Sequence, residues 1–217
     1  MLIQWFGQAC FKLSTKPGPN GEVTVIFDPF DSTKVGLTLP KLTADVVAVT
    51  HDHFDHNHVA AVGGEYFLVN GPGEYEAKQT FFYGIAGWHD NTQGAERGAN
   101  TMYLFESEGI SVAHLGDIGQ IELNDNQLEF LEGADVLLIP VGGVYTVNAK
   151  QAHELVNQIE PRIVIPMHYK LPGLKIELEA VDKFVKELGL TPQYEDKFRL
   201  AKKDLPQEET KLVVLKP

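Results

Sequence analysis

The chain has 217 residues, of which 43% are hydrophobic and 22% are charged, so it can bury a substantial core; we expect one domain over residues 1–217. Its 30 acidic residues outnumber its 18 basic ones, and the net charge of -12 argues against binding to nucleic acid or to an anionic membrane. No apolar run approaches the roughly 18 residues of a membrane span. A single cysteine, Cys10, and an N-terminus unlike a signal peptide predict a cytoplasmic protein.

The first fifty residues are predicted to form strands. Residues 2–6, 10–13 and 23–27 read as a meander, with a turn over residues 16–21 that is rich in proline and glycine. The apolar run 46–49 predicts a further buried strand, and a short helix is expected to begin near His56.

Strands and helices alternate in the remainder of the chain. Strands are predicted over residues 66–69, 80–85, 101–105, 110–115 and 136–140. Helices are predicted from a cap at Asn124 or Asp125 through residue 131, over residues 149–159, and over residues 177–188. This alternation predicts an α/β fold in layers, with strands outnumbering helices.

A dense group of metal-binding side chains follows the strand over residues 46–49. His51, His53, Asp55 and His56 have the spacing H-x-H-x-D-H. In extended backbone His51 and His53 point to the same side, so both rings can bind one ion. Imidazole nitrogen and carboxylate oxygen suit zinc, and also iron or manganese. A solvated, histidine-rich loop is the alternative interpretation, and the spacing favours metal binding.

Three further candidate ligands lie at the ends of later predicted strands, at His89, Asp117 and His168. Side chains at strand ends from distant parts of a chain are typical of an active site at the rim of a sheet. For one ion the sequence offers His51, His53 and His89, and for a second ion it offers Asp55, His56 and His168. Asp117 can bridge the two ions.

The order of these seven residues resembles that of the metallo-β-lactamase superfamily. The runs around residues 5–11, 27–30 and 166–169 are similar to one branch, the zinc-dependent hydrolases related to L-ascorbate-6-phosphate lactonase. The resemblance implies an αββα four-layer sandwich, with two mixed β-sheets flanked by helices and a dinuclear site. Asp117 stands where the secreted β-lactamases usually have cysteine, so antibiotic hydrolysis is not expected as the main activity. Gln8 stands where this branch usually has histidine, and Gln8 cannot titrate.

This ligand set predicts a metal-dependent hydrolase with two divalent ions, zinc first and Mn or Fe as alternatives. A metal-bound hydroxide would attack a small ester, lactone or phosphoester. Asp55 would orient the hydroxide or protonate the leaving group, and Asp117 would fix the bridge. The partner is a small molecule, with an anionic group allowed. The sequence leaves open an oligomer, a di-iron oxidoreductase on the same ligands, and a metal-binding scaffold without turnover.

Other side chains have a functional and a structural interpretation. Asp28 is expected to accept a hydrogen bond from a ligand imidazole, and His114 to lie behind the ligands or in the core. Arg97 could bind an anionic group or form a local salt bridge. Tyr145 could donate to a developing oxyanion or pack in a turn. Tyr169 and Lys170 are candidates for the pocket wall.

Overall fold

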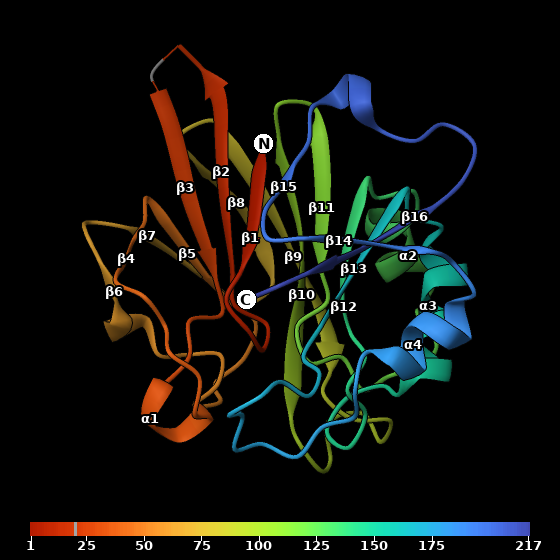
Figure 1. The fold of residues 1–217 in the computed structure, drawn as a ribbon. Helices are drawn as coiled ribbons and strands as arrows, with labels where there is room; N and C mark the ends of the chain where they lie inside the picture. Colours follow the sequence, from red (N-terminus) through yellow and green to blue (C-terminus); the bar gives the residue numbers. More distant parts are fainter. Residues whose placement is uncertain (20) are drawn as a thin grey trace.

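Two β-sheets pack face to face, with their apolar side chains between them (Figure 1). The structure is a computed structural model that describes residues 1–19 and 21–217. The first sheet has the order β15-β1-β2-β3-β5-β7, and the second β14-β16-β13-β12-β11-β10-β9-β8. A small two-stranded sheet pairs β4 with β6. The predicted αββα sandwich of mixed sheets is confirmed.

The first sheet contains antiparallel and parallel pairs: β1 to β3 form an antiparallel meander, and β3, β5 and β7 run parallel. Its strands are β1 (Leu2–Trp5), β2 (Phe11–Gly18), β3 (Gly21–Phe27), β5 (Val46–Val49), β7 (Phe67–Asn70) and β15 (Phe198–Arg199). The small sheet is formed by β4 (Leu42–Thr43) and β6 (Val62–Gly63).

The second sheet is parallel from β11 to β16 and antiparallel from β8 to β11. Its strands are β8 (Gly73–Ala77), β9 (Thr80–Trp88), β10 (Ala99–Ser107), β11 (Ile110–His114), β12 (Val136–Pro140), β13 (Ile163–Met167), β14 (Pro192–Glu195) and β16 (Lys211–Leu215). Every residue of β12 and β13 is buried, as expected for strands covered on both faces.

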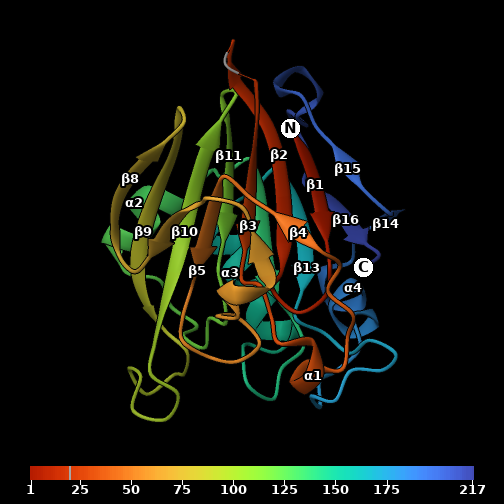
Figure 2. The ribbon, with the colours of Figure 1, turned by 90° about the vertical axis from the view of Figure 1, so that its left-hand side faces the viewer.

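Helices cover the outer face of the second sheet. They are α2 (Asp125–Leu131), α3 (Ala149–Ile159) and α4 (Asp182–Leu188), seen together at the right of Figure 1. The layer outside the first sheet is thinner. It holds α1 (Ser32–Val35), the 3-10 helix η1 (Val59–Ala61) and the β4-β6 pair (Figure 2). A second 3-10 helix, η2 (Lys202–Asp204), lies in the C-terminal segment. No helix in the described part of the chain is long and apolar enough to cross a membrane.

Local sequence explains where two of these helices begin. Asn124 and Asn148 each accept a hydrogen bond from the backbone three residues on, and the glutamine at that position bonds back to the cap. These capping boxes fix the starts of α2 and α3. The buried face of α3 repeats every three or four residues, and it packs against the sheet. Its members are Ala149, Ala152, Leu155, Val156 and Ile159.

Three predicted local structures have other bounds than expected. The short helix expected near His56 is the 3-10 helix η1, which begins at Val59 after His58 N has donated to Pro29 O. Helix α4 starts at Asp182, after a segment in which Glu179 N binds Gly142 O and Lys170 N binds Glu179 O. The predicted turn over residues 16–21 is shorter because β2 continues to Gly18; Asn20 lies outside the described residues.

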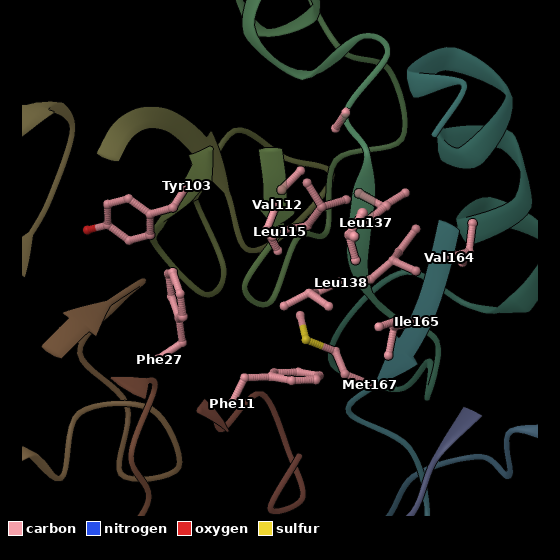
Figure 3. Close-up of a cluster of buried hydrophobic side chains, with 14 of the residues drawn as sticks. Phe11, Phe27, Tyr103, Val112, Leu115, Leu137, Leu138, Val164, Ile165 and Met167 are labelled. Atoms are coloured by element: carbon pink, nitrogen blue, oxygen red, sulfur yellow. The ribbon is translucent and has the colours of Figure 1, made fainter. Parts of the chain in front are cut away.

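The core between the sheets is built from large apolar side chains of both. Figure 3 shows Phe11 of the first sheet next to Leu138 and Met167 of the second, and Phe27 of the first sheet next to Tyr103 of the second. All five are inaccessible to solvent. Fully burying one such side chain contributes about 1.5–3 kcal/mol, so this interface holds the two sheets, and the loops at their ends, in a fixed relation.

Candidate metal centre

The candidate ligands follow strands that all run in one direction. In the second sheet, β9 and β11 are both antiparallel to β10, and β11 is parallel to β12 and β13. The residues after these strands therefore leave at the same edge of the sheet. In the first sheet the same relation holds for β1, β3 and β5. The sandwich thus collects loops from both sheets at one rim, where α/β proteins place ligands.

The first cluster, here called the triple-histidine group, consists of His51, His53 and His89. One nitrogen from each ring lies within 4.8 Å of the others. His51 Nε2 and His53 Nδ1 are 3.0 Å apart, and the ring centroids of His51 and His89 are 4.8 Å apart. His51 and His89 are buried, whereas His53 is exposed. This group therefore opens toward solvent through His53.

The second cluster, here called the mixed group, consists of Asp55, His56, Asp117 and His168. All four are buried, and their donor atoms also lie within 4.8 Å of one another. Asp117 Oδ2 is 3.2 Å from His56 Nε2 and 3.3 Å from His168 Nε2. Asp55 Oδ2 is 3.5 Å from His168 Nε2 and 3.6 Å from His56 Nε2.

Asp117 connects the two groups. The same Oδ2 atom that faces His56 and His168 lies 3.4 Å from His89 Nε2. Its backbone N–H donates to Asn100 Oδ1 at 2.9 Å, and Asn100 Nδ2 donates to Leu115 O at 2.9 Å. The carboxylate is thus held where the two groups meet. The seven predicted residues are therefore brought together, in the two sets that the sequence suggested.

Asp28 orients one imidazole in each group. Its Oδ2 accepts from His56 Nδ1–H at 2.8 Å, as the sequence led us to expect, so His56 Nε2 is the nitrogen that faces the mixed group. The same oxygen accepts from Thr50 Oγ1 at 2.7 Å, and that hydroxyl lies 3.0 Å from His51 Nδ1. Because the Thr50 hydrogen is used on Asp28, the hydroxyl accepts from His51 Nδ1–H. This leaves the His51 Nε2 lone pair free to bind an ion.

Burial and charge act differently on the histidines. Burial, followed by the nearby His56, lowers the pKa of His51 to about 2, and burial also lowers the pKa of His53. Burial alone would lower the pKa of His56, but the carboxylates of Asp117, Asp55 and Asp28 outweigh it and raise that pKa well above 6.5. Without metal, positive charge is therefore concentrated in the mixed group.

The carboxyl groups of the mixed group are held ionised. Burial opposes ionisation of Asp55, but the charge of His56 and the hydrogen bond to His168 lower its pKa. Burial also opposes ionisation of Asp117, but the charges of His168 and then His56 outweigh it and lower the pKa of this carboxyl group. Both carboxylates are therefore ready to bind a cation near neutral pH.

His114 belongs to the core behind the site, in line with the structural interpretation. Its Nε2–H donates to Ala9 O at 2.9 Å, and its Nδ1 accepts from Gly116 N–H at 3.1 Å. The ring stacks on Phe27 at 4.9 Å between centroids. Both nitrogens of His114 are therefore used within the core. They hold the backbone of Ala9 and of Gly116, the residues that precede Cys10 and Asp117.

The remaining candidates lie outside the two groups. The Arg97 guanidinium stacks over the Tyr145 ring at 5.9 Å and lies 3.6 Å from Glu96 Oε2, so the predicted local salt bridge is present. Tyr145 is exposed on the loop after β12. Tyr169 is buried against Trp5 and donates to Leu215 O at 3.3 Å, so it faces the core instead of a pocket. Lys170, by contrast, is exposed.

The donor atoms fit metal ions. Several fully buried polar atoms find no hydrogen-bond partner within residues 1–19 and 21–217, and all belong to this site. They are Gln8 Oε1, His56 Nε2, His89 Nδ1, Asp117 Oδ1 and His168 Nδ1. Four donors around one zinc at its usual bond lengths are about 3.3–3.6 Å apart, close to the spacings in the mixed group. Of these atoms, His56 Nε2 faces the mixed group, 3.2 Å from Asp117 Oδ2, whereas His89 and His168 approach Asp117 through Nε2 and not through the unpaired Nδ1.

Comparison with known proteins identifies the family. Residues 2–168, from β1 to the last candidate ligand, match the family described as the Beta-lactamase superfamily domain. The chain belongs to the beta-lactamase superfamily. A UPF0173 metal-dependent hydrolase of Thermoplasma acidophilum is 28% identical over 193 residues, covering 78% of this chain and 83% of that protein.

Solved structures agree with this membership of the beta-lactamase superfamily. A Thermotoga maritima protein assigned as a Zn-dependent hydrolase of the metallo-beta-lactamase superfamily is 36% identical, with a TM-score of 0.79 over 99% of this chain and 97% of that one. CmlA, a diiron beta-hydroxylase from Streptomyces venezuelae, shares the fold at a TM-score of 0.62 and 14% identity, covering 87% of this chain and 51% of that one. The relatives named metal-dependent hydrolases agree with the enzyme class predicted from the sequence.

Proposed function

We propose that this member of the beta-lactamase superfamily hydrolyses a small ester, lactone or phosphoester with two divalent ions, zinc in the first instance. The observation that carries the proposal is the pair of abutting donor groups joined by Asp117 Oδ2, which lies 3.4 Å from His89 and 3.3 Å from His168. When bound, two such ions lower the pKa of a water toward neutrality and polarise the oxygen that gains charge.

In this proposal the triple-histidine group holds one ion and the mixed group the other, with Asp117 shared. Asp28 keeps His56 in the tautomer that presents Nε2 to the site, and through Thr50 it does the same for His51. These residues are already aligned by hydrogen bonds to the backbone and to each other. Little rearrangement is therefore needed when ions bind.

Asp55 is the proposed proton-handling group. Its carboxylate is buried beside His56 and His168, and their charge and hydrogen bonding favour its ionised form. An ionised Asp55 can accept a proton from the attacking water at its carboxylate and return it to the leaving oxygen. No serine or cysteine nucleophile is required. Cys10 is fully buried outside the cluster, and burial raises the pKa of its thiol.

Arg97 and Tyr145 are the proposed contacts for the rest of the substrate. They stack on each other, from the loops that follow β9 and β12, whose ends lie on the same edge as the site. A guanidinium supported by an aromatic ring suits an anionic group on the substrate. Because the sequence runs around residues 5–11, 27–30 and 166–169 resemble those of L-ascorbate-6-phosphate lactonase, we would test phosphorylated lactones first in a substrate panel.

Elemental analysis of protein purified without chelators tests the proposal. We expect about two ions per chain in the wild type and about one in His168→Ala. Zinc or manganese leads to lactone and phosphoester assays, whereas iron leads to oxidation assays and favours the di-iron alternative. Asp55→Asn with its metal retained should lose turnover. A chain that binds no metal after reconstitution would refute the hydrolase proposal.

A further inference from the structure

Gln8 lies beside the mixed group in a tightly held conformation. It follows β1, is fully buried, and has the left-handed φ of +48°. Its carbonyl oxygen accepts from Trp5 Nε1 at 2.9 Å and from the backbone N–H of His168 at 3.1 Å. The backbone of Gln8 is thus fixed to the same turn that carries His168, so the side chain has little freedom to withdraw.

The Gln8 carboxamide reaches into the donor shell. Its terminal nitrogen Nε2 lies 3.0 Å from both Asp55 Oδ2 and His168 Nε2. Its oxygen Oε1 is buried and finds no hydrogen-bond partner in the described part of the protein. One side of the amide therefore touches two candidate ligands, and the other side has an unsatisfied acceptor.

An ion in the mixed group changes which amide atom belongs there. Once Asp55 and His168 direct their lone pairs at a cation, an N–H₂ group between them would face the positive charge and an occupied nitrogen lone pair. Rotating the amide by half a turn exchanges oxygen and nitrogen, which are nearly equal in size. The oxygen then takes the position next to the ion and gains a partner, and the N–H₂ group moves to the buried place of Oε1, away from the positive charge.

The distances also match a ligand. Two donors at right angles around one ion, with bonds near 2.1 Å, are about 3.0 Å apart, whereas tetrahedral neighbours are about 3.3–3.6 Å apart. Gln8 is 3.0 Å from Asp55 Oδ2 and from His168 Nε2, and the other spacings in the group are 3.2–3.6 Å. These spacings have room for a fifth donor beside the four, and 3.0 Å is also the length of the hydrogen bonds that the Gln8 amide makes without metal.

We propose that Gln8 is a further ligand of the ion in the mixed group and binds it through its amide oxygen. The proposal rests on the two-ion function above. It gives the two ions different numbers of protein ligands. The mixed group supplies five protein donors, and the triple-histidine group supplies three besides the shared Asp117. The ion of the triple-histidine group is then the one with positions open to water and substrate.

Competition with a chromophoric zinc chelator, measured on the full-length protein, tests this assignment. We expect Gln8→Leu and the shorter amide Gln8→Asn to weaken the binding of one of the two zinc ions at least tenfold and to leave the other unchanged. Gln8→Glu keeps an oxygen at the same reach and should bind that ion at least as tightly as the wild type. Gln193→Leu, on the exposed part of β14, is the control for the substitution itself.

A crystal structure of the zinc-loaded wild type provides the second readout. We expect the Gln8 amide oxygen within about 2.0–2.3 Å of one ion. Unchanged affinity for both ions in Gln8→Leu, or an amide that remains more than about 3 Å from the ion, would overturn the assignment. If the wild type binds fewer than two ions, the proposed function fails instead; if it binds two and the variants match it, the role of Gln8 alone fails.

Discussion

The triple-histidine group and the mixed group lie side by side, but the chain holds them differently. Every member of the mixed group is buried, and two of its four members are carboxylates. The triple-histidine group has only neutral donors of its own and opens to solvent at His53. The mixed group can therefore compensate the charge of an ion, whereas the other group leaves most of that charge to act on water and substrate. We therefore expect the mixed group to hold its ion tightly and the triple-histidine group to leave its ion accessible to water and substrate.

Removing the shared carboxylate should have the largest effect on both groups. We expect Asp117→Ala to lower kcat/KM by about 10³-fold, a loss of roughly 4 kcal/mol of transition-state stabilisation, and to reduce the metal content of both groups. Steady-state kinetics and elemental analysis would measure this. Asp52→Ala is the control, because Asp52 lies between two ligands in the sequence but is exposed and accepts a hydrogen bond from Asn57. If only one ion is lost, Asp117 does not bridge.

The next effect comes from Asp28, which supports one ligand in each group. We expect Asp28→Asn to weaken metal binding by about 10–100-fold, because an amide N–H₂ would oppose the donors of one carboxylate oxygen: either His56 Nδ1–H and the Thr50 hydroxyl, which share Oδ2, or the Thr50 backbone N–H, which binds Oδ1. The direct bond to His56 predicts a greater loss for the mixed group. Asp45→Asn, which removes a carboxylate bonded to Thr24 and Lys78, should not change metal affinity. Equal effects of the two variants would argue against an orienting role for Asp28.

The two groups should also differ in the protons that they release. The raised pKa of His56 means that the metal-free mixed group holds a proton at pH 7, which an ion must displace. The lowered pKa values of His51 and His53 leave these rings already neutral. We therefore expect binding to the mixed group to strengthen as pH rises toward the pKa of His56, with release of about one proton.

Calorimetry in two buffers of different ionisation enthalpy would count these protons. In His53→Ala the mixed group is intact, so this variant reports the protons released by the mixed group. His56→Ala reports those released by the triple-histidine group. Equal proton release from the two variants would contradict the expected difference between the groups.

The smallest expected effect concerns the loop that follows His89. The Asp90 carboxylate accepts hydrogen bonds from the backbone of Thr92, Gly94, Glu96 and Arg97, and from the Thr92 hydroxyl. Burial would raise the pKa of Asp90, but these bonds, with that of Arg97 first, lower it. The stabilisation they give is therefore complete above the ordinary aspartate pKa of about 4 and is lost as pH falls through the lowered value.

Asp90→Ala should accelerate amide hydrogen exchange in residues 92–97 at neutral pH, with a modest loss of metal from the triple-histidine group alone. Exchange unchanged in this loop would show that other contacts hold it. The pH dependence of exchange in the wild type provides an independent check on the sign.

Much of this fold could be predicted from local sequence. The boundaries of β12 and α3 agree with the prediction, because a continuous apolar run and a capping box are strong local signals. The edge strand β8, with its exposed sequence Gly73–Ala77, has no such signal and was not predicted. The start of α4 could not be placed, because backbone contacts between residues 142, 170 and 179 determine it.

The site shows the same division. Spacing and position at strand ends suggested seven residues that the structure brings together. The sequence did not indicate Thr50 or Asn100, which orient His51 and Asp117, because their partners lie across tertiary contacts. Gln8 was noticed only as a departure from a family pattern, and its contact with Asp55 spans 47 positions of the chain.

The hydrogen bonds of His114 also have a consequence for folding. This ring belongs to β11 of the second sheet, yet it donates to Ala9 O in the loop between β1 and β2 of the first sheet, the loop that also carries Gln8. Candidate ligands 51–56 likewise come from the first sheet, and residues 89, 117 and 168 from the second. Neither half can assemble the centre alone. During refolding from denaturant, capture of metal should therefore coincide with docking of the sheets, and a fluorescent zinc probe would report that late step.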